Sequence, residues 1–411
     1  MLCQFAFSNY RSYQDETVLT MQATRLAELS DTLIQYGDKQ RFLPVCALYG
    51  PNAGGKSNLL EALEFLCDAV SNPIVVLKSS RTAGQRSVSG AAPLPHSSPF
   101  AFDTESKLKH TSFEVYFRVG SYEYRYYLAV HVDQIVAELL QRRKIGASRT
   151  ALLFERDVEG VTLGLMLRRS GVSTTFNPEI PYLSYLRMNT DIDAIREAAD
   201  WFVNTSFLNY GNRYLEESLE DSLVEERGEE IVAFLKAVDV SISGIRFERS
   251  APDDGSRSQR VYIKHRVADE EYELRLGEES SGTQKLIGLA TPLLEGLRRG
   301  SLVVADELDA KLHPKLLRYI VLLFKNAKAN PCGAQLIFTT QNVAIMRGDI
   351  LRRDEIWFAE RDTSGRSMLW SLADLREPDG SPVGRAVSYE RPYLFGKYGA
   401  DPQLERIEEW F

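Results

Sequence analysis

Three short apolar runs stand out along the chain, and each is followed by polar residues. The runs cover residues 43–49, 302–305 and 336–338. Continuous apolar segments of this length are typical of strands buried on both faces of a parallel sheet. Residues 58–66, after the first run, have the apolar spacing of a helix, and a similar pattern ends at Leu297. These segments predict an α/β fold.

A different pattern fills residues 111–169. Apolar and polar residues alternate there, most clearly over 122–130, which predicts antiparallel strands. Tyr122, Tyr124 and Tyr126 share one face of such a strand. They fit either a half-buried strand face, which we favour, or a surface on which bases stack.

The remaining segments suggest how the chain divides into parts. Ser, Gly, Ala and Pro are frequent over 78–99, which predicts a flexible loop. Helical patterns cover 191–242, with an irregular hinge expected at Ser206–Arg213, and 245–276 return to strands. We expect a discontinuous head and an inserted lobe. The head would contain 1–77 and 244–411, and the lobe, 78–243, would follow its loop with a β-rich part over 100–170 and a helical part over 171–243.

The first apolar run leads into a glycine-rich segment. Residues 50–57 read Gly-Pro-Asn-Ala-Gly-Gly-Lys-Ser, which is the pattern of a phosphate-binding loop, or P-loop. Glycines let the backbone turn tightly and point its N–H groups at phosphate oxygens, and the following helix adds its positive end. Lys56 would bridge the β- and γ-phosphates of a nucleotide, and the Ser57 hydroxyl would bind Mg²⁺.

The second apolar run ends in two acids, Asp306 and Glu307. Adjacent carboxylates beside a core are costly to bury, so their position suggests chemistry. Asp306 would hold Mg²⁺ through its water shell. Glu307 would act on the attacking water as a base or as an orienting acceptor. With the P-loop, this pair predicts an ATP-binding protein that hydrolyses ATP.

Between these two motifs, Glu279–Lys285 reads Glu-Ser-Ser-Gly-Thr-Gln-Lys at the start of a helical pattern. It fits a plain helix N-cap. It also fits a second anion site, with free N–H groups and hydroxyls. One chain has little use for two such sites on one nucleotide, whereas a dimer could close this turn over the nucleotide held by its partner.

Composition limits the possible partners. The net charge of −8 confines any contact with DNA or RNA to local clusters such as Arg142–Lys144 with Arg149, or Arg168-Arg169, although solvated faces are the simpler interpretation. No apolar run is long enough to cross a membrane. Four scattered cysteines without a Cys-x-x-Cys pair fit reduced thiols in the cytoplasm.

In this order, the motifs resemble the heads of ABC-type and SMC-like ATPases. The opening residues 5–13, the acidic pair and Leu312-His313-Pro314 are similar to RecF-like and OLD-like heads. With residues 356–358, 369–372 and 393–399, they are similar to stand-alone prokaryotic AAA-family ATPases related to OLD, including the Septu, PARIS and RloA types. The resemblance implies a P-loop NTPase of the ABC-head type, with a mixed sheet and an inserted α+β lobe.

The resemblance also implies a set of site residues. Catalysis would involve Glu307, Lys56 and Gln341, and Mg²⁺ would be bound by Ser57 and Asp306. These heads usually have His at the switch position after strand 335–340, where this chain has Gln341. An uncharged amide cannot carry the charge of an imidazolium, so hydrolysis is expected to be slow. The alternative is that Gln replaces His at this position without any effect on the rate. The implied nucleotide contacts are Gly50, Asn52, Gly54, Gly55, Lys56, Ser57, Asn58, Ser280, Ser281, Gly282 and Asp309.

The expected function is that of an ATP-driven switch, with ATP and Mg²⁺ as cofactors. It would form a homodimer or a higher homo-oligomer through its ATP sites and control a separate nuclease or toxin in anti-phage defence. No nuclease motif is visible in this chain, so we expect the effector on another one. The alternative, from a different class, is a RecF- or SMC-like ATPase that binds DNA during repair or maintenance.

Overall fold

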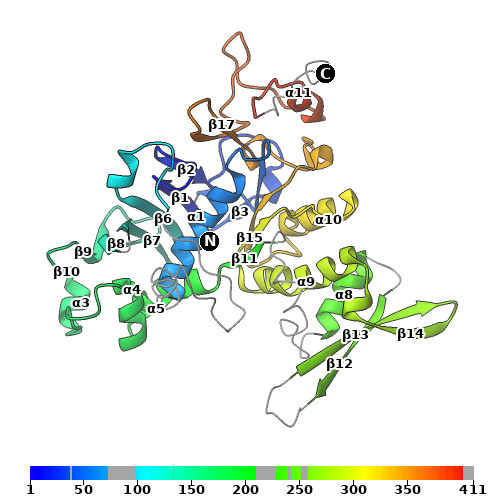
Figure 1. Cartoon of the computed structure of the whole chain (residues 1–411), viewed down its shortest axis with the longest axis horizontal. Coiled ribbons are helices and arrows are strands. Elements are labelled where there is room, and N and C mark those ends of the chain that lie inside the picture. Colours follow the sequence, from blue (N-terminus) through cyan, green and yellow to red (C-terminus); the bar gives the residue numbers. More distant parts are fainter. Residues whose placement is uncertain are drawn as a thin grey trace.

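The structure of the chain is a computed structural model (Figure 1). It describes residues 1–37, 39–72, 98–132, 134–209, 228–238, 242–250 and 258–400. Most of the loop expected over 78–99 and the end of the chain from residue 401 lie outside the described residues.

A six-stranded sheet at the centre of the molecule carries the P-loop. Its strand order is β11-β15-β16-β5-β17-β18, and all neighbouring pairs are parallel except β17 with β18. The expected strands before the P-loop and the acidic pair are therefore confirmed. The strands are β11 (Ser206–Asn209), β15 (Leu302–Asp306), β16 (Gln335–Thr339), β5 (Val45–Tyr49), β17 (Ile356–Arg361) and β18 (Ser367–Ser371).

A second sheet, antiparallel throughout, lies beside the first. Its order is β10-β9-β8-β7-β6-β1-β2, so the chain's first strand pairs with β6 and with β2. The alternation over 111–169 had predicted antiparallel strands, and this is confirmed for β6 to β10, whereas Leu165–Arg169 at the end of the range forms a short helix. The strands are β1 (Leu2–Ser8), β2 (Thr17–Thr20), β6 (Thr111–Val119), β7 (Tyr122–His131), β8 (Gln134–Lys144), β9 (Thr150–Arg156) and β10 (Val161–Leu163).

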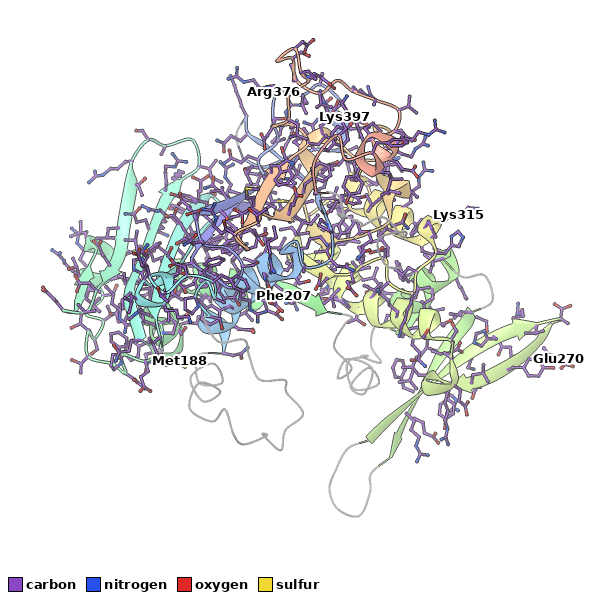
Figure 2. The ribbon with its side chains drawn as sticks, turned by 45° about the horizontal axis from the view of Figure 1, so that its top comes forward. Met188, Phe207, Glu270, Lys315, Arg376 and Lys397 are labelled. Carbon is purple, nitrogen blue, oxygen red and sulfur yellow. The ribbon has the colours of Figure 1, made fainter. Side chains whose placement is uncertain are left out.

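A third sheet extends away from the rest of the molecule (Figures 1 and 2). It contains β12 (Ile242–Ser250), β13 (Ser258–Val267) and β14 (Glu270–Arg275), in that order. All side chains of β14 are exposed. Helix α8 (Gly228–Val238) packs on β12 and on α9 (Ser281–Arg299), which joins this part to the central sheet.

The remaining elements are short connections and helices around the sheets. The long helix α1 (Lys56–Ser71) follows the P-loop directly. The other α-helices described are α3 (Leu165–Arg169), α4 (Tyr182–Asn189), α5 (Asp193–Val203), α10 (Pro314–Lys325) and α11 (Glu390–Leu394). The shortest elements are η1 (Ser30–Thr32), β3 (Ile34–Gln35), β4 (Arg41–Phe42), η2 (Ser106–Leu108), η4 (Leu276–Glu278), η5 (Val343–Ile345) and η6 (Arg353–Glu355). None of the helices in the described part of the chain combines the length and apolar character needed to cross a membrane.

Strand β5 contributes alternate side chains to two separate cores. Cys46 and Leu48 pack into a cluster with α1, α5 and the antiparallel sheet. Val45, Ala47 and Tyr49 pack into the cluster on the other face, with α9 and α10. Burial on both faces explains why the run before the P-loop is continuously apolar.

Hydrogen bonding crosses the boundaries expected between head and lobe. Strand β6 pairs with β1, and β11 pairs in parallel with β15. Through these pairings, residues 98–209 contribute to the two large sheets. The part with a sheet of its own is α8 with β12–β14.

Two local expectations have different outcomes. The irregular hinge expected at Ser206–Arg213 is wrong for its described part, because Ser206–Asn209 forms strand β11, and Phe207 lies near the middle of the molecule (Figure 2). A four-residue strand is too short to show a period in the sequence. Tyr124 and Tyr126 are fully buried and Tyr122 is partly buried, which confirms the favoured interpretation of a strand face packed on the protein.

Candidate functional site

The segments after β5, β15 and β16 come together at one edge of the central sheet. They line a cavity of about 290 Å³ together with the end of β17. The carboxyl ends of parallel strands meet at the same edge, which is why motifs 250 residues apart share one cavity. The lining residues are Asn52, Ala53, Gly54, Gly55, Lys56, Ser57, Asn58, Asp306, Glu307, Asp309, Thr339, Thr340, Gln341 and Arg361.

The P-loop lies directly against the backbone of β17. A β-carbon at Gly50 would stand 2.1 Å from the Ala359 carbonyl oxygen, and one at Gly54 would stand 2.6 Å from the same atom. Gly50 also has φ of +142°, a conformation that side chains rarely adopt. These glycines are therefore required for the loop to fit against the sheet.

The start of α1 is held by the turn between β1 and β2 and by Ser367, the first residue of β18. Gly55 precedes the helix with φ of 109°, and a β-carbon there would meet Ser367 Oγ at 2.3 Å. Ser12 Oγ accepts hydrogen bonds from Asn58 Nδ2 at 2.7 Å and from Ser367 Oγ at 2.8 Å. The first N–H groups of α1 lack partners within the helix, and they lie at the cavity.

Lys56 is folded back onto the loop. Its Nζ donates to the carbonyl oxygens of Gly50 at 2.7 Å and Pro51 at 2.8 Å. Burial lowers the pKa of Lys56, and the nearby carboxylates of Asp306, Glu307 and Asp309 oppose that shift. The ammonium group thus lies between the P-loop and the acids, where a bound phosphate would bring it a stronger partner.

A threonine connects the two acids to the neighbouring strand. Thr339 Oγ1 donates to Asp306 Oδ1 at 2.5 Å and accepts from the Glu307 N–H at 2.7 Å. Glu307 has φ of +50°, in the left-handed region that non-glycine residues seldom occupy. Such a conformation persists only where neighbouring contacts hold it.

A lysine of helix α9 supplies another of these contacts. Lys285 Nζ donates to the Glu307 carbonyl oxygen at 2.8 Å. Burial lowers the pKa of Lys285 to about 8, although Asp309 and Glu307 act in the opposite direction. Because α9 begins at Ser281, the Ser-Ser-Gly turn and Glu307 are connected through this side chain.

The switch residue reaches back to the P-loop. Gln341 Nε2 donates to Asn52 Oδ1 at 2.8 Å, and the Gln341 N–H donates to Asp309 Oδ2 at 3.2 Å. The side chain is exposed at the cavity. An amide in this place can donate or accept but carries no charge.

The Ser280–Gln284 turn lies outside this cavity. None of its residues is among the described residues that line it. Ser280 caps α9, since its Oγ accepts from the Thr283 N–H at 3.1 Å. A β-carbon at Gly282 would stand 3.0 Å from the Lys311 carbonyl oxygen. Ser281 is exposed.

Sequence reasoning assigned no site role to three residues that the structure places at or beside the site. Thr339 was noted only as part of the segment that leads to the switch residue Gln341, and Lys285 only as the last residue of the Ser-Gly segment. Arg361 is the last residue of β17 and belongs to no recognisable motif, so no signal in the sequence pointed to it. All three depend on strands or helices that are distant in the chain.

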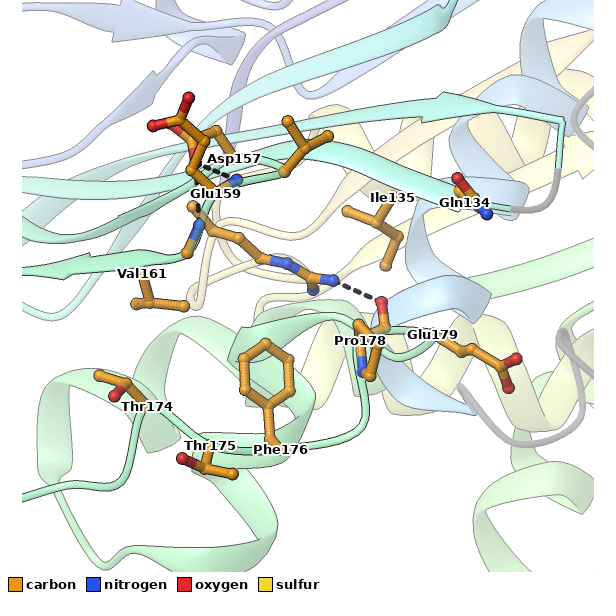
Figure 3. A pocket seen from close by; sticks show the side chains of 13 residues that line it. Gln134, Ile135, Asp157, Glu159, Val161, Thr174, Thr175, Phe176, Pro178 and Glu179 are labelled. Atoms are coloured by element: carbon orange, nitrogen blue, oxygen red, sulfur yellow. Dashed lines mark hydrogen bonds between the residues drawn. The ribbon is translucent and has the colours of Figure 1, made fainter.

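A larger cavity, of about 760 Å³, lies at the far end of the antiparallel sheet between residues 156–161 and 174–179 (Figure 3). Its buried Arg156 donates to the carbonyl oxygens of Pro178 and Ile180 and stands 4.8 Å from the Phe176 ring. These contacts give Arg156 a structural role. The P-loop and the acidic pair line the smaller cavity and not this one.

Two arginines of the basic clusters that were considered as nucleic-acid contacts interact with side chains of their own sheet. Arg142 lies over the Tyr122 ring at 4.3 Å, and Arg143 forms an ion pair with Glu123. Arg168 and Arg169 are in the last turn of α3, and both are exposed.

The donor set of the small cavity fits a nucleoside triphosphate with Mg²⁺. It combines a glycine loop without room for side chains, a lysine, the hydroxyl of Ser57 and the carboxylate of Asp306. The N–H groups of a glycine loop and a lysine ammonium bind phosphate oxygens, and Mg²⁺ binds oxygen ligands such as the hydroxyl and the carboxylate. The parallel sheet and this site define a P-loop NTPase with an ABC-type head and a mixed α/β fold.

The family comparison agrees with this class. The profile described as "AAA domain, putative AbiEii toxin, Type IV TA system" matches residues 45–347. This range extends from the strand before the P-loop to beyond Gln341. The chain belongs to this family and contains an AAA-type ATPase domain. No curated protein matches the chain.

Solved structures similar to this chain include three SMC head domains. The head from Thermotoga maritima is 14% identical with a TM-score of 0.39, covering 90% of this chain and 98% of that chain. The head from Pyrococcus furiosus, bound to the C-terminal domain of ScpA, is 13% identical with a TM-score of 0.44, covering 90% and 96%. The head from Pyrococcus yayanosii is 12% identical with a TM-score of 0.43, covering 92% and 98%.

The contacts of Thr339 lead to a prediction about turnover. Replacing Thr339 by Val removes the hydroxyl that bonds Asp306 and Glu307, while the strand keeps a residue of similar shape. We expect ATP turnover to fall about tenfold, the size of one lost polar contact, with ATP affinity within a few-fold of the parent. Thr339→Ser keeps the hydroxyl and serves as the control. Equal turnover in the Val and Ser variants would show that these hydrogen bonds do not support the acids.

Proposed function

We propose that this protein is an ATP-hydrolysing switch that dimerises around ATP and controls a separate effector, a nuclease or toxin, in prokaryotic anti-phage defence. The supporting observation is the meeting of the P-loop, the acidic pair and Gln341 around one cavity, while the Ser280–Gln284 turn stands outside it.

Each residue of the cavity has a defined task in this proposal. Lys56 and the N–H groups at the start of α1 bind phosphate oxygens, and Ser57 and Asp306 hold Mg²⁺. The metal ion, when bound, neutralises part of the triphosphate charge. Glu307 orients the attacking water and accepts its proton. Gln341, fixed to Asn52, orients the terminal phosphate through its amide.

The dimer completes the site in this proposal. The exposed Ser281 and the N–H groups at the start of α9 would bind the terminal phosphate of the nucleotide held by a second copy of the chain. Lys285 connects that turn to Glu307 within one subunit. ATP binding in one subunit and the position of Glu307 in the other would therefore be coupled.

The proposed setting is prokaryotic anti-phage defence. It rests on the resemblance to Septu-, PARIS- and RloA-type ATPases and on the ATPase domain that the family match gives. Within it, the protein acts in the cytoplasm and its effector is a separate chain. Co-purification of the tagged protein with the products of neighbouring genes, with and without ATP, tests this part. Salt-sensitive DNA binding by the purified chain alone, with no protein partner, would favour the RecF-like alternative.

Two variants test the nucleotide chemistry. Lys56→Ala removes the charge beside the phosphates and should weaken ATP binding at least tenfold. Glu307→Gln keeps the shape but cannot accept a proton, so ATP should still bind while turnover falls about 100-fold. ATP binding and phosphate release, measured on both variants and the parent, give the answer. Glu307 has no role as the base if Glu307→Gln releases phosphate at the parent rate.

A second test concerns assembly. Ser281→Arg places a large side chain at the exposed start of α9, where a partner's nucleotide would approach. In the Glu307→Gln background with ATP, light scattering should show a dimer or higher oligomer without this change and a monomer with it. Ala327→Arg, on the exposed turn after α10, is the matched control. Retention of the dimer in Ser281→Arg would contradict the shared site.

A third test concerns the switch residue. His at position 341 can carry a charge that Gln cannot, so Gln341→His should raise turnover several-fold. Gln341→Leu, which loses the hydrogen bond to Asn52, should lower it. Steady-state phosphate release at pH 6 and pH 8 compares the three proteins. An unchanged or lower rate in Gln341→His at both pH values would mean that Gln341 does not limit hydrolysis.

A further inference from the structure

An aromatic side chain stands exposed beside the small cavity. Phe102 is 66% exposed, whereas Phe100, two residues before it, is 2% exposed. The Phe102 ring centroid lies 5.9 Å from the guanidinium carbon of Arg361, and Arg361 lines the cavity. An exposed aromatic ring is unremarkable alone, but here it adjoins an arginine at the mouth of a phosphate-binding cavity.

The ring is supported from behind. Gly365, in the turn between β17 and β18, has φ of +79°, and a β-carbon there would stand 2.9 Å from Phe102 Cδ2. Phe100 meets the same ring edge-on, with centroids 5.7 Å apart. The ring therefore packs on a glycine at one side and keeps most of its surface open.

The segment that carries Phe102 is fixed to the P-loop through the turn between β1 and β2. The Phe100 N–H donates to Asn9 Oδ1 at 3.0 Å, and Gln14 Nε2 donates to Asp103 Oδ2 at 3.0 Å. Ser12, in the same turn, bonds to Asn58 at the start of α1. The ring and the phosphate loop thus have a defined relative position.

The order of the strands indicates which way a nucleotide would lie in this cavity. Strand β5 lies between β16 and β17. Asp306 ends β15, Glu307 comes next, and Gln341 comes after β16, on one side of the P-loop. Arg361 ends β17, on the other side. A triphosphate whose terminal phosphate and Mg²⁺ meet the acids would extend its ribose and base toward Arg361 and Phe102.

We propose that Phe102 and Arg361 form the binding site for the purine base of the nucleotide, with the base stacked on the open face of Phe102 and flanked by the Arg361 guanidinium. This inference rests on the proposed function and adds the base to it. Aromatic stacking accepts any base through its π-face, and an arginine adds a cation–π contact. Affinity would then come from two separate contacts, the phosphates on the P-loop and the base on Phe102.

Comparing a ligand that has a base with one that lacks it tests the proposal. The affinities of ATP and inorganic tripolyphosphate, both with Mg²⁺, are measured by calorimetry on the full chain. Phe102→Ala should weaken ATP binding about tenfold, the effect of one lost base stack, and leave tripolyphosphate binding unchanged. Phe102→Tyr keeps the aromatic face and should bind ATP like the parent. Arg361→Gln should weaken ATP binding more than tripolyphosphate binding.

A spectroscopic readout reports on stacking directly. Phe102→Trp should lose indole fluorescence when ATP is added, but not when tripolyphosphate is added, after subtraction of the parent's signal. Phe395→Ala, another exposed phenylalanine, is the control for surface truncation.

The outcomes separate the two proposals. Equal losses of ATP and tripolyphosphate affinity in Phe102→Ala would overturn the base site, because the ring would then only support the fold around the P-loop. Unchanged ATP affinity, or a parent that binds tripolyphosphate as tightly as ATP, would overturn it as well. If the parent binds neither ligand, the proposed function fails and takes the base site with it.

Discussion

The close approach of the P-loop to strand β17 is the constraint on which the site depends. The Ala359 carbonyl oxygen leaves no room for a β-carbon at Gly50 or Gly54. With the backbone held there, Lys56 and the start of α1 face the ends of β15 and β16. A loop displaced by one side chain would carry its N–H groups and its lysine away from the acids. The sheet therefore fixes the site through backbone packing before any ligand binds.

The acidic pair is held in a different way, by polar side chains from neighbouring elements. Thr339 bonds both Asp306 and the Glu307 N–H, and Lys285 bonds the Glu307 carbonyl oxygen. These contacts surround a residue whose φ is +50°. Because the supports come from β16 and α9, the conformation of Glu307 depends on two elements that are separate from its own strand.

The position of each strand gives the cavity two unlike ends. The acids and Gln341 lie on the β16 side of the P-loop, and Arg361 with Phe102 lies on the β17 side. A ligand with a charged end and an aromatic end matches this arrangement. The third sheet, β12–β14, extends away from both ends, and α8 connects it to α9, which packs on the central sheet.

The strands around the P-loop, the loop itself and the acids could be predicted from the sequence, because each is encoded by a local pattern. A P-loop needs its glycines and lysine at fixed spacing, and a strand buried on both faces needs a continuous apolar run. The same local patterns missed β11, whose four residues are too few to show a period, and placed a boundary between β1 and β6, which are paired. The tertiary structure alone brought Thr339 and Arg361 to the cavity, Lys285 to Glu307 and Phe102 to Arg361. Their roles come from hydrogen bonds and packing between segments far apart in the chain, and such contacts leave no periodicity or spacing in the sequence.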